Sequence, residues 1–402
     1  MLVTGGGGPA ERRVPGSLTP PPSTLAGTAG HSRRMPPTIA DFQAAGLYDP
    51  AAPDAANRLA LLEWLVERGA SIEQMVRAAQ TGTLLDVAGE LGRAPGRRLT
   101  LAEAAAVAGM SAERIEAIRF AVGLPRAGAD EPVVGEEEAR SFEVFTYGEE
   151  LFGPAGIRRF TQVIGTSLAR VAEAAMSLSM ANLLGPIRER GGDDRALAEA
   201  RFRAAQSVGP LSEAVAHLFR AHMGVAARRI GAAPQQGALN VMPMAVGFLD
   251  LVGFTTLARQ VDARALAAVI DRFEETAHDV TTAGDGRVVK FIGDEVMFVT
   301  RDPAAACGIA LALVERFAGD AAVTPRGAIA AGDVLVRGGD YYGPVVNLAA
   351  RAAELAVPRE ILVTESVASL APAALRFEPA GRRALKGFDE PVRLFTVERT
   401  AS

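Results

Sequence analysis

The pattern of apolar and polar positions along the chain changes once, close to residue 240. From Asp41 to about Arg229, apolar residues recur with the three- to four-residue spacing of amphipathic helices. The segment Asn57–Arg68 (NRLALLEWLVER) is a clear example. Beyond Met242 the apolar runs become short and are separated by turn residues, which is typical of strands alternating with helices. The pattern therefore predicts an all-α part followed by an α+β part.

Breaks in this pattern predict the domain boundaries. Residues 1–38 are rich in Gly, Pro, Ser and Thr and lack apolar periodicity, so we expect a disordered leader there. Residues 39–230 should form the helical domain. The sequence GAAPQQG then interrupts the helical pattern and indicates a linker at 231–241, before a second domain at 242–402.

The second domain should begin with a strand that ends in Asp250 and continue as a mixture of helices and strands. The order is that of an α+β sandwich. We expect a helix at Thr256–Thr282, a hairpin of Val288–Ile292 and Glu295–Thr300, a helix at Pro303–Phe317, a strand at Arg326–Val336, a helix at Gly343–Leu355 and a closing hairpin at Ala384–Glu398.

Leu99–Leu124 has the pattern of a helix-turn-helix, with a corner at Gly109 and Ser111 as the cap of its second helix. Such a motif can bind DNA. However, Glu113 and Glu116 occupy the helix that would contact the bases. We therefore favour a packed helical corner and expect no nucleic-acid partner.

Val171–Ile187 carries a single charge, Glu173, and predicts a buried helix. Its length is close to that of a short membrane span, but charges near its start and Gly185–Pro186 near its end argue against one. An alternative is that its apolar side chains line a pocket for a fatty acid or another apolar ligand. Those side chains are Met176, Leu178, Met180 and Leu183.

Composition narrows the class of protein. The chain has 402 residues, a net charge of −5 and a pI near 5.6, which does not favour a nucleic-acid partner. A single cysteine, Cys307, excludes an internal disulfide framework and fits a reducing cytoplasm, with peripheral membrane attachment as an alternative. Of the 42 basic residues only Lys290 and Lys386 are lysines, so these two compact cations stand out.

Two acids lie where strands end. Asp250 lies near the end of one apolar run, and Asp294 occupies the tight turn between the strands of the predicted hairpin. Two carboxylates at a common sheet edge suit a hard divalent cation such as Mg²⁺, with substrate phosphates completing its shell. Each acid taken alone is better explained as an ordinary turn residue.

Three motifs in order resemble the catalytic domain of the class III nucleotide cyclases: FLDLVGFT, then KFIGDE, then DYYGPVVNLAAR. The resemblance covers roughly Met242 to Glu398. It implies a ferredoxin-like βαββαβ core that converts ATP to cyclic AMP as a head-to-tail homodimer. The helical half, with its GIRRF stretch, resembles the regulatory domain that precedes the catalytic domain in one actinobacterial group of adenylate cyclases.

By this resemblance, Asp250 and Asp294 hold two Mg²⁺ or Mn²⁺ ions, and the carbonyl of Leu251 is an additional ligand. The following backbone amides, at a turn that enters a helix, can bind phosphate oxygens. They belong to Val252, Gly253, Phe254 and Thr255.

The remaining charged positions receive roles on the same basis. Lys290 can donate to N1 of adenine and Asp340 can accept from its 6-amino group, which favours ATP over GTP. Asn347 and Arg351 are four residues apart on one helix, so they reach the same place and would serve the ribose and the transition state. Lys386 would bind the triphosphate.

Two further hypotheses concern regulation and the alternative to catalysis. His217 and His222 lie in the last helical run before the linker, and histidine changes charge near neutral pH. We expect the helical domain to act on the catalytic domain through this run, with acidification as a candidate signal. The alternative function is an inactive cyclase-like domain that serves as a sensor or interaction module.

Overall fold

The computed structural model describes residues 37–93, 96–231, 240–320, 322–370 and 374–400. By their internal contacts the residues form two compact units, one of Met1–Arg93 with Leu184–Gln206 and one of Ala94–Leu183 with Ser207–Ser402. Most of the predicted leader (1–38) and of the predicted linker (231–241) lies outside the described residues. The domain boundaries therefore remain predictions.

The first unit is helical, and its core surrounds Trp64. The Trp64 ring is 2% exposed and meets the edge of Phe202 with ring centroids 5.7 Å apart. Ser71 caps a helix, because its hydroxyl accepts a hydrogen bond from the Gln74 amide at 3.1 Å. The helices are α1 (Ile39–Ala44), α2 (Ala55–Glu67), α3 (Ile72–Gln80), α4 (Leu84–Gly92), α10 (Gly185–Glu189) and α11 (Asp194–Gln206).

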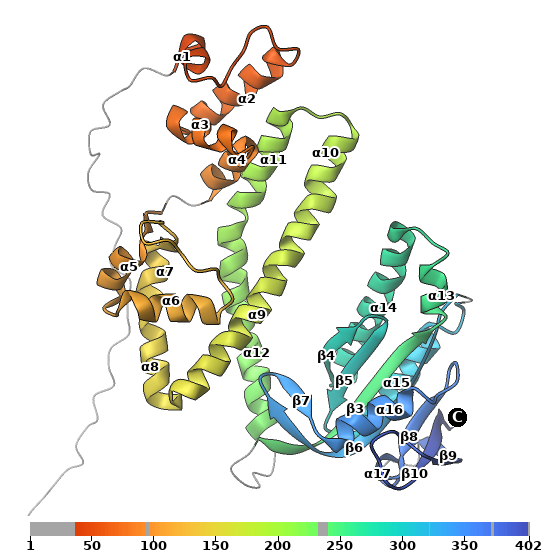
Figure 1. The fold of residues 1–402 in the computed structure, drawn as a ribbon. Coiled ribbons are helices and arrows are strands. Elements are labelled where there is room, and N and C mark those ends of the chain that lie inside the picture. Colours follow the sequence, from red (N-terminus) through yellow and green to blue (C-terminus); the bar gives the residue numbers. More distant parts are fainter. Residues whose placement is uncertain (1–36, 94–95, 232–239, 321, 371–373, 401–402) are drawn as a thin grey trace, which may run out of the picture. The chain divides into compact units, whose positions relative to one another are not determined.

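The N-terminal part of the second unit is also almost entirely helical (Figure 1). The short strands β1 and β2 pair antiparallel and join its first helices. Its elements are β1 (Arg98–Leu99), α5 (Leu101–Ala108), α6 (Ala112–Ala121), β2 (Val134–Gly135), α7 (Glu136–Ser141), α8 (Glu143–Phe152), α9 (Pro154–Ser179), the π-helical turn η1 (Met180–Leu184) and, after the first unit's α10 and α11, α12 (Val208–Gly231).

The predicted helix-turn-helix is present as α5 and α6. Gly109 ends α5 with a left-handed φ of 66°, and the Ser111 hydroxyl caps α6 by accepting from the Arg114 amide. The end of α6 packs against α9 so closely that a Cβ at Gly165 would collide with the backbone of Val122. These contacts fit the packed helical corner.

The prediction of a buried helix at Val171–Ile187 is wrong. The segment runs through the end of α9, η1 and the start of α10, and its apolar side chains are largely exposed. Met176 is 62% exposed and Leu178 66%. Apolar composition alone did not determine which side chains are covered. No helix in the described part of the chain is long and apolar enough to cross a membrane.

The C-terminal part of the second unit is an α+β domain built on an eight-stranded sheet. The strands run in the order β4-β5-β3-β6-β8-β10-β9, and β7 pairs with β6. Its elements are β3 (Val241–Val252), α13 (Phe254–Ala258), α14 (Ala263–Ala283), β4 (Arg287–Ile292), β5 (Glu295–Thr300), α15 (Pro303–Arg316), β6 (Thr324–Arg337), β7 (Asp340–Tyr342), α16 (Pro344–Ala353), β8 (Ile361–Thr364), α17 (Glu365–Ala368), β9 (Leu375–Arg383) and β10 (Val392–Arg399).

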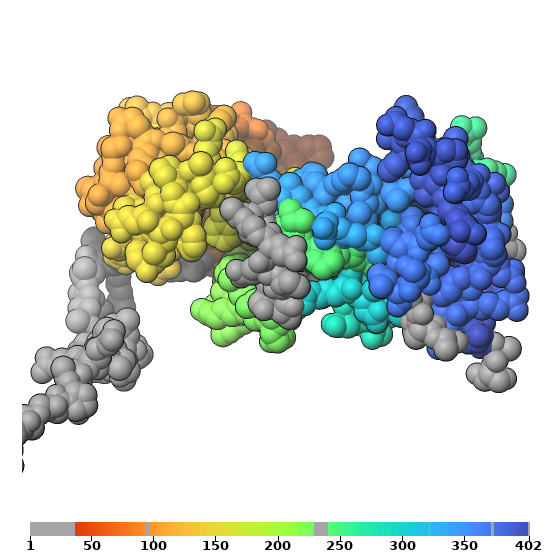
Figure 2. Space-filling model, turned by 90° about the horizontal axis from the view of Figure 1, so that it is seen from below, coloured from red at the N-terminus to blue at the C-terminus, as the bar shows by residue number. Residues whose placement is uncertain are grey.

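The order β3-α14-β4-β5-α15-β6 confirms the βαββαβ core. The four core strands pair antiparallel with one another, with β3 between β5 and β6, whereas β6 pairs parallel with β8 on its other side. Apolar side chains of α14 and α15 cover one face of the sheet, whereas those of α16 cover the other, here called the α16 face. The residues from β4 to β10, coloured cyan to dark blue in Figure 2, form one closely packed body.

Two predicted elements differ in extent. The single helix expected at Thr256–Thr282 is divided into α13 and α14, because Asp262 caps a new helix by accepting from the Ala265 amide at 2.8 Å. The closing hairpin is formed by β9 and β10, so it begins before the predicted Ala384, and Ala384–Pro391 is its connection.

Candidate functional site

The strand register places a row of charged residues across one end of the sheet. Asp250 of β3 lies directly opposite Glu295 of β5 and opposite Arg326 of β6. Residues directly opposite one another share a face of the sheet. Residues two positions away along a strand point to the same face. Phe248, two residues from Asp250, and Ala328, two residues from Arg326, belong to the cluster beneath α16, so the row lies on the α16 face.

Arg326 binds Asp250 through two nitrogens of its guanidinium. Nε donates to Oδ1 at 2.9 Å and Nη2 to Oδ2 at 3.1 Å. The third nitrogen, Nη1, donates to the carbonyl of Ala356 at 2.7 Å, just beyond the end of α16. The hydrogen bond to Asp250 raises the pKa of Arg326, which holds the guanidinium in its charged form.

Asp294 lies beside this pair, in the tight turn between β4 and β5. Burial raises the pKa of its half-buried carboxyl; the charge of Asp250 also raises it, while Arg326 acts in the opposite direction. Burial, with the charges of Asp250, Asp294 and Glu354, raises the pKa of Glu295 to about 7. The structure thus brings the two predicted metal acids into one electrostatically coupled cluster.

The donor set suits a hard cation that is shared with a substrate. Among the residues the structure describes, no group of three or more His, Cys, Asp or Glu side chains is placed to hold a metal ion by itself. Two carboxylates at one sheet end match the way Mg²⁺ binds together with substrate phosphates. Both oxygens of Asp250 accept from Arg326, and each keeps a second lone pair for a cation.

The chain leaves this edge through a turn that requires glycine. Gly253 has a φ of 93°, and a Cβ there would lie 2.6 Å from the carbonyl oxygen of Ala322. This turn follows Asp250 and Leu251 in the sequence and carries Val252, Phe254 and Thr255. The helix that follows, α13, has only five residues, so its dipole adds little to any anion binding by these amides.

Lys290 and Asp340 meet directly. Lys290 Nζ lies 2.6 Å from Asp340 Oδ2, and Asp340 Oδ1 accepts from the Tyr341 amide at 2.9 Å. Lys290 is opposite Met297 of β5, which belongs to the cluster beneath α16, so this pair also lies on the α16 face.

Asn347 and Arg351 lie on α16, as predicted, away from the buried alanine face of that helix. Arg351 Nη1 donates to Glu354 Oε1 at 2.5 Å. Lys386 is exposed in the connection between β9 and β10, and no contact within the described residues joins it to the other candidates. His217 and His222 are exposed on α12, where His217 Nδ1 lies 3.4 Å from Arg220 Nη1.

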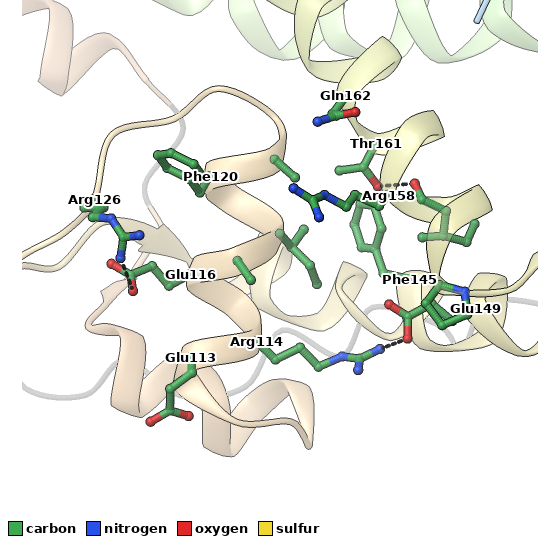
Figure 3. A pocket seen from close by; sticks show the side chains of 15 residues that line it. Glu113, Arg114, Glu116, Phe120, Arg126, Phe145, Glu149, Arg158, Thr161 and Gln162 are labelled. Atoms are coloured by element: carbon green, nitrogen blue, oxygen red, sulfur yellow. Dashed lines mark hydrogen bonds and ion pairs between the residues drawn. The ribbon is translucent and has the colours of Figure 1, made fainter. Parts of the chain in front are cut away.

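A separate cavity of about 640 Å³ lies between α6, α8 and α9 (Figure 3). Its wall carries ion pairs of Arg114 with Glu149 at 2.6 Å and of Arg126 with Glu116 at 3.3 Å. Arg158 extends into the space between α6 and α9. None of the four apolar side chains predicted to line a lipid pocket lines this cavity, so the structure does not support that pocket.

Sequence reasoning missed Arg326, Glu295 and Glu354. Arg326 is the one charged residue in the apolar run PRGAIAAG, and this position was the available signal. Its role depends on strand pairing across 76 positions of sequence, which no local pattern reveals.

The family described as the adenylate cyclase regulatory domain matches residues 40–224. An uncharacterized protein of Mycobacterium tuberculosis (strain ATCC 25618 / H37Rv), Rv2212, is 32% identical over 360 residues, which cover 89% of this chain and 93% of that protein. The pH-sensitive adenylate cyclase MT1302 of M. tuberculosis (strain CDC 1551 / Oshkosh) is 30% identical over 367 residues, or 86% of this chain and 89% of the relative. An adenylate cyclase of Streptomyces coelicolor is 31% identical over 334 residues, which cover 80% of this chain and 79% of that relative.

Among solved structures, the adenylyl cyclase CyaB from P. aeruginosa is 25% identical, with a TM-score of 0.37. It covers 40% of this chain and 96% of the solved chain.

Glu295 should make the stability of the metal-free protein depend on pH. Its carboxyl keeps its proton up to about pH 7 in the folded chain, against an ordinary value of 4.5, so the folded state binds more protons between these pH values. Stability contributed by this group is present below about pH 4.5 and is lost as the pH rises through 7. Glu295→Gln should therefore gain stability relative to wild type from pH 5 to pH 8, on the order of 2 kcal/mol.

The measurement is urea unfolding in EDTA at several pH values. Glu275→Gln, on the exposed surface of α14, is the matched control and should follow wild type. Parallel stability curves for Glu295→Gln and wild type would contradict the assignment.

Proposed function

The chain belongs to the class III adenylate cyclases of the group, known from actinobacteria, in which a regulatory domain precedes the catalytic domain. From this we propose that it converts ATP to 3′,5′-cyclic AMP and pyrophosphate. It is a nucleotide cyclase, and thus a lyase. The observation that carries the finer proposal is the clustering of Asp250, Asp294 and Arg326 at one sheet end, on the face where Lys290 also meets Asp340.

In the proposed reaction the 3′-hydroxyl of the ribose releases its proton to solvent water, and its oxygen attacks the α-phosphorus of the same ATP. A bond forms between that oxygen and the phosphorus, the bond to the bridging α–β oxygen breaks, and pyrophosphate leaves. Such phosphoryl transfer depends mainly on positioning and on stabilisation of charge. The charged residues of the proposed site would therefore act by holding or neutralising part of the nucleotide.

Asp250, Asp294 and the carbonyl of Leu251 would hold two Mg²⁺ or Mn²⁺ ions. When bound, these ions supply Lewis acidity that lowers the pKa of the 3′-hydroxyl and neutralises the triphosphate. Arg326 balances Asp250 before the nucleotide binds. Its guanidinium, held at the same edge, is then suited to phosphate oxygens, as is exposed Lys386.

The Lys290–Asp340 pair supports a preference for adenine. An ammonium donates to N1 of adenine and a carboxylate accepts from the 6-amino group. Guanine presents a donor at N1 and an acceptor at O6, which would face Asp340 unfavourably. Because the two side chains contact one another within one chain, a single subunit would supply both.

We further propose that the active unit is a head-to-tail homodimer. Asn347 and Arg351 would reach the nucleotide held by the metal acids of the partner chain, and Arg351 would stabilise charge on the phosphoryl oxygens. Within one chain, Arg351 is bound by Glu354, the residue directly after α16, so its guanidinium is held near the end of that helix.

Cyclase activity should require both metal acids. Asp250→Ala and Asp294→Ala should each reduce formation of cyclic AMP from ATP and Mn²⁺ at least ~100-fold, because each removes a shared metal ligand. Asp279→Ala, at an exposed position of α14, is the control and should keep wild-type activity. A wild-type chain that forms no cyclic AMP would instead favour the inactive sensor module, and a tenth of the activity remaining in either acid variant would refute the metal assignment.

The helical part should regulate this activity, and protons are the proposed signal. The relative from M. tuberculosis CDC 1551 is described as pH-sensitive. His217 and His222 lie on α12, which leads into the catalytic part, and His217 lies beside Arg220. The full chain and a chain that starts at Gly237 should therefore show different pH profiles of cyclic AMP formation between pH 5.5 and 8.

His217→Gln and His222→Gln together should bring the profile of the full chain towards that of the shorter chain. Parallel profiles for the full and shorter chains would exclude proton sensing. Equal activities at every pH would exclude regulation by the helical part.

A further inference from the structure

A bulge in β4 places two cations on one side of the sheet. In an unbroken strand, residues three apart point to opposite faces. Here the register shifts between Val288 and Lys290, so that Arg287 lies opposite Val299 and Lys290 opposite Met297. Val299 and Met297 both belong to the cluster beneath α16. The bulge therefore directs Arg287 and Lys290 to the α16 face, an arrangement that bulges often produce beside functional sites.

Asp340 directly follows a tight turn on that face. Strands β6 and β7 pair from Arg337 to Asp340, and the two residues between them, Gly338 and Gly339, have φ values of 61° and 81°. Two consecutive positive φ values are typical of a two-residue hairpin turn that requires glycine. A turn made of two glycines has little intrinsic rigidity, because glycine has wide backbone freedom.

Arg287 contacts the residues on both sides of Asp340. Its Nη2 donates to the carbonyl oxygen of Gly339 at 3.1 Å. Its guanidinium carbon lies 5.9 Å from the ring centroid of Tyr341, a side chain that is only 6% exposed. The Asp340 carboxylate itself is bound by the Tyr341 amide and by Lys290, so its orientation depends on this backbone.

We propose that Arg287 is a positioning residue that holds the Gly339–Tyr341 backbone, so that Asp340 is oriented to select the base of the nucleotide. This inference rests on the proposed function, in which Asp340 accepts from the 6-amino group of adenine. A carboxylate of Asp340 that is less firmly oriented binds the 6-amino group of adenine more weakly. It also repels the O6 of guanine more weakly. Loss of Arg287 therefore lowers the use of ATP more than the use of GTP.

The experiment compares kcat/KM for ATP and GTP, with Mn²⁺, in wild type and Arg287→Gln. The ratio of the two values, ATP over GTP, should fall about tenfold in the variant. Arg287→Lys keeps the charge but loses the planar guanidinium, so its ATP-over-GTP ratio should lie between those of wild type and Arg287→Gln. A role confined to stability would lower both values equally and leave their ratio unchanged.

Arg393→Gln is the matched control. Arg393 is likewise on a strand; its side chain lies 3.3 Å from Glu365 Oε1, and its guanidinium lies 5.4 Å from the ring of Phe395. Its nucleotide ratio should stay within about twofold of wild type.

Binding gives a second readout that needs no turnover. The dissociation constants of 3′-deoxyATP and 3′-deoxyGTP, which lack the attacking hydroxyl, should show the same shift in preference in Arg287→Gln. An unchanged ratio in both kinetics and binding would overturn the proposal.

Lys290→Glu separates this outcome from failure of the proposed function. If Lys290→Glu changes the base preference and Arg287→Gln does not, only the role of Arg287 is wrong. If wild type shows no preference between ATP and GTP, the base-selecting pair itself is wrong, and the role of Arg287 falls with it.

Discussion

The site depends on the charge balance between Asp250 and Arg326. Asp250, Asp294 and Glu295 lie close together on a partly buried sheet end, and like charges at such a site oppose one another's ionisation. The bidentate contact from Arg326 places a positive charge against Asp250 and fixes the orientation of its carboxylate before any cation binds. The same guanidinium donates a hydrogen bond to the carbonyl of Ala356, just beyond the end of α16. Arg326 therefore links the sheet end to the segment that follows the helix carrying Arg351.

Much of the fold and of the site could be predicted from the sequence where the signal is local. The turn that carries Asp294 follows from two short apolar runs joined by Gly-Asp, and the shared face of Asn347 and Arg351 follows from helical spacing. The bulge that places Lys290 on the same face of the sheet as Arg287 could not be predicted, because it appears only in the pairing register of β4 with β5. The contact between Arg326 and Asp250 has the same long-range origin.

The helical half shows where apolar pattern misleads. Val171–Ile187 predicts burial by composition, yet Met176 and Leu178 are exposed, and the described side chains of α12 are almost all exposed or only partly buried. The hydrophobicity of a side chain does not by itself determine whether other residues cover it. In contrast, the caps at Ser71 and Ser111 are local hydrogen bonds, and the structure contains both.

The central claim is that the nucleotide is processed by residues from two chains, and mixing two inactive variants tests it most directly. Asp250→Ala and Arg351→Ala should each form almost no cyclic AMP alone. Co-expressed, half of the dimers are mixed and each has one intact site, so activity should recover to roughly a quarter of wild type. No recovery in a mixture shown to exchange subunits would place the whole site within one chain and contradict the account.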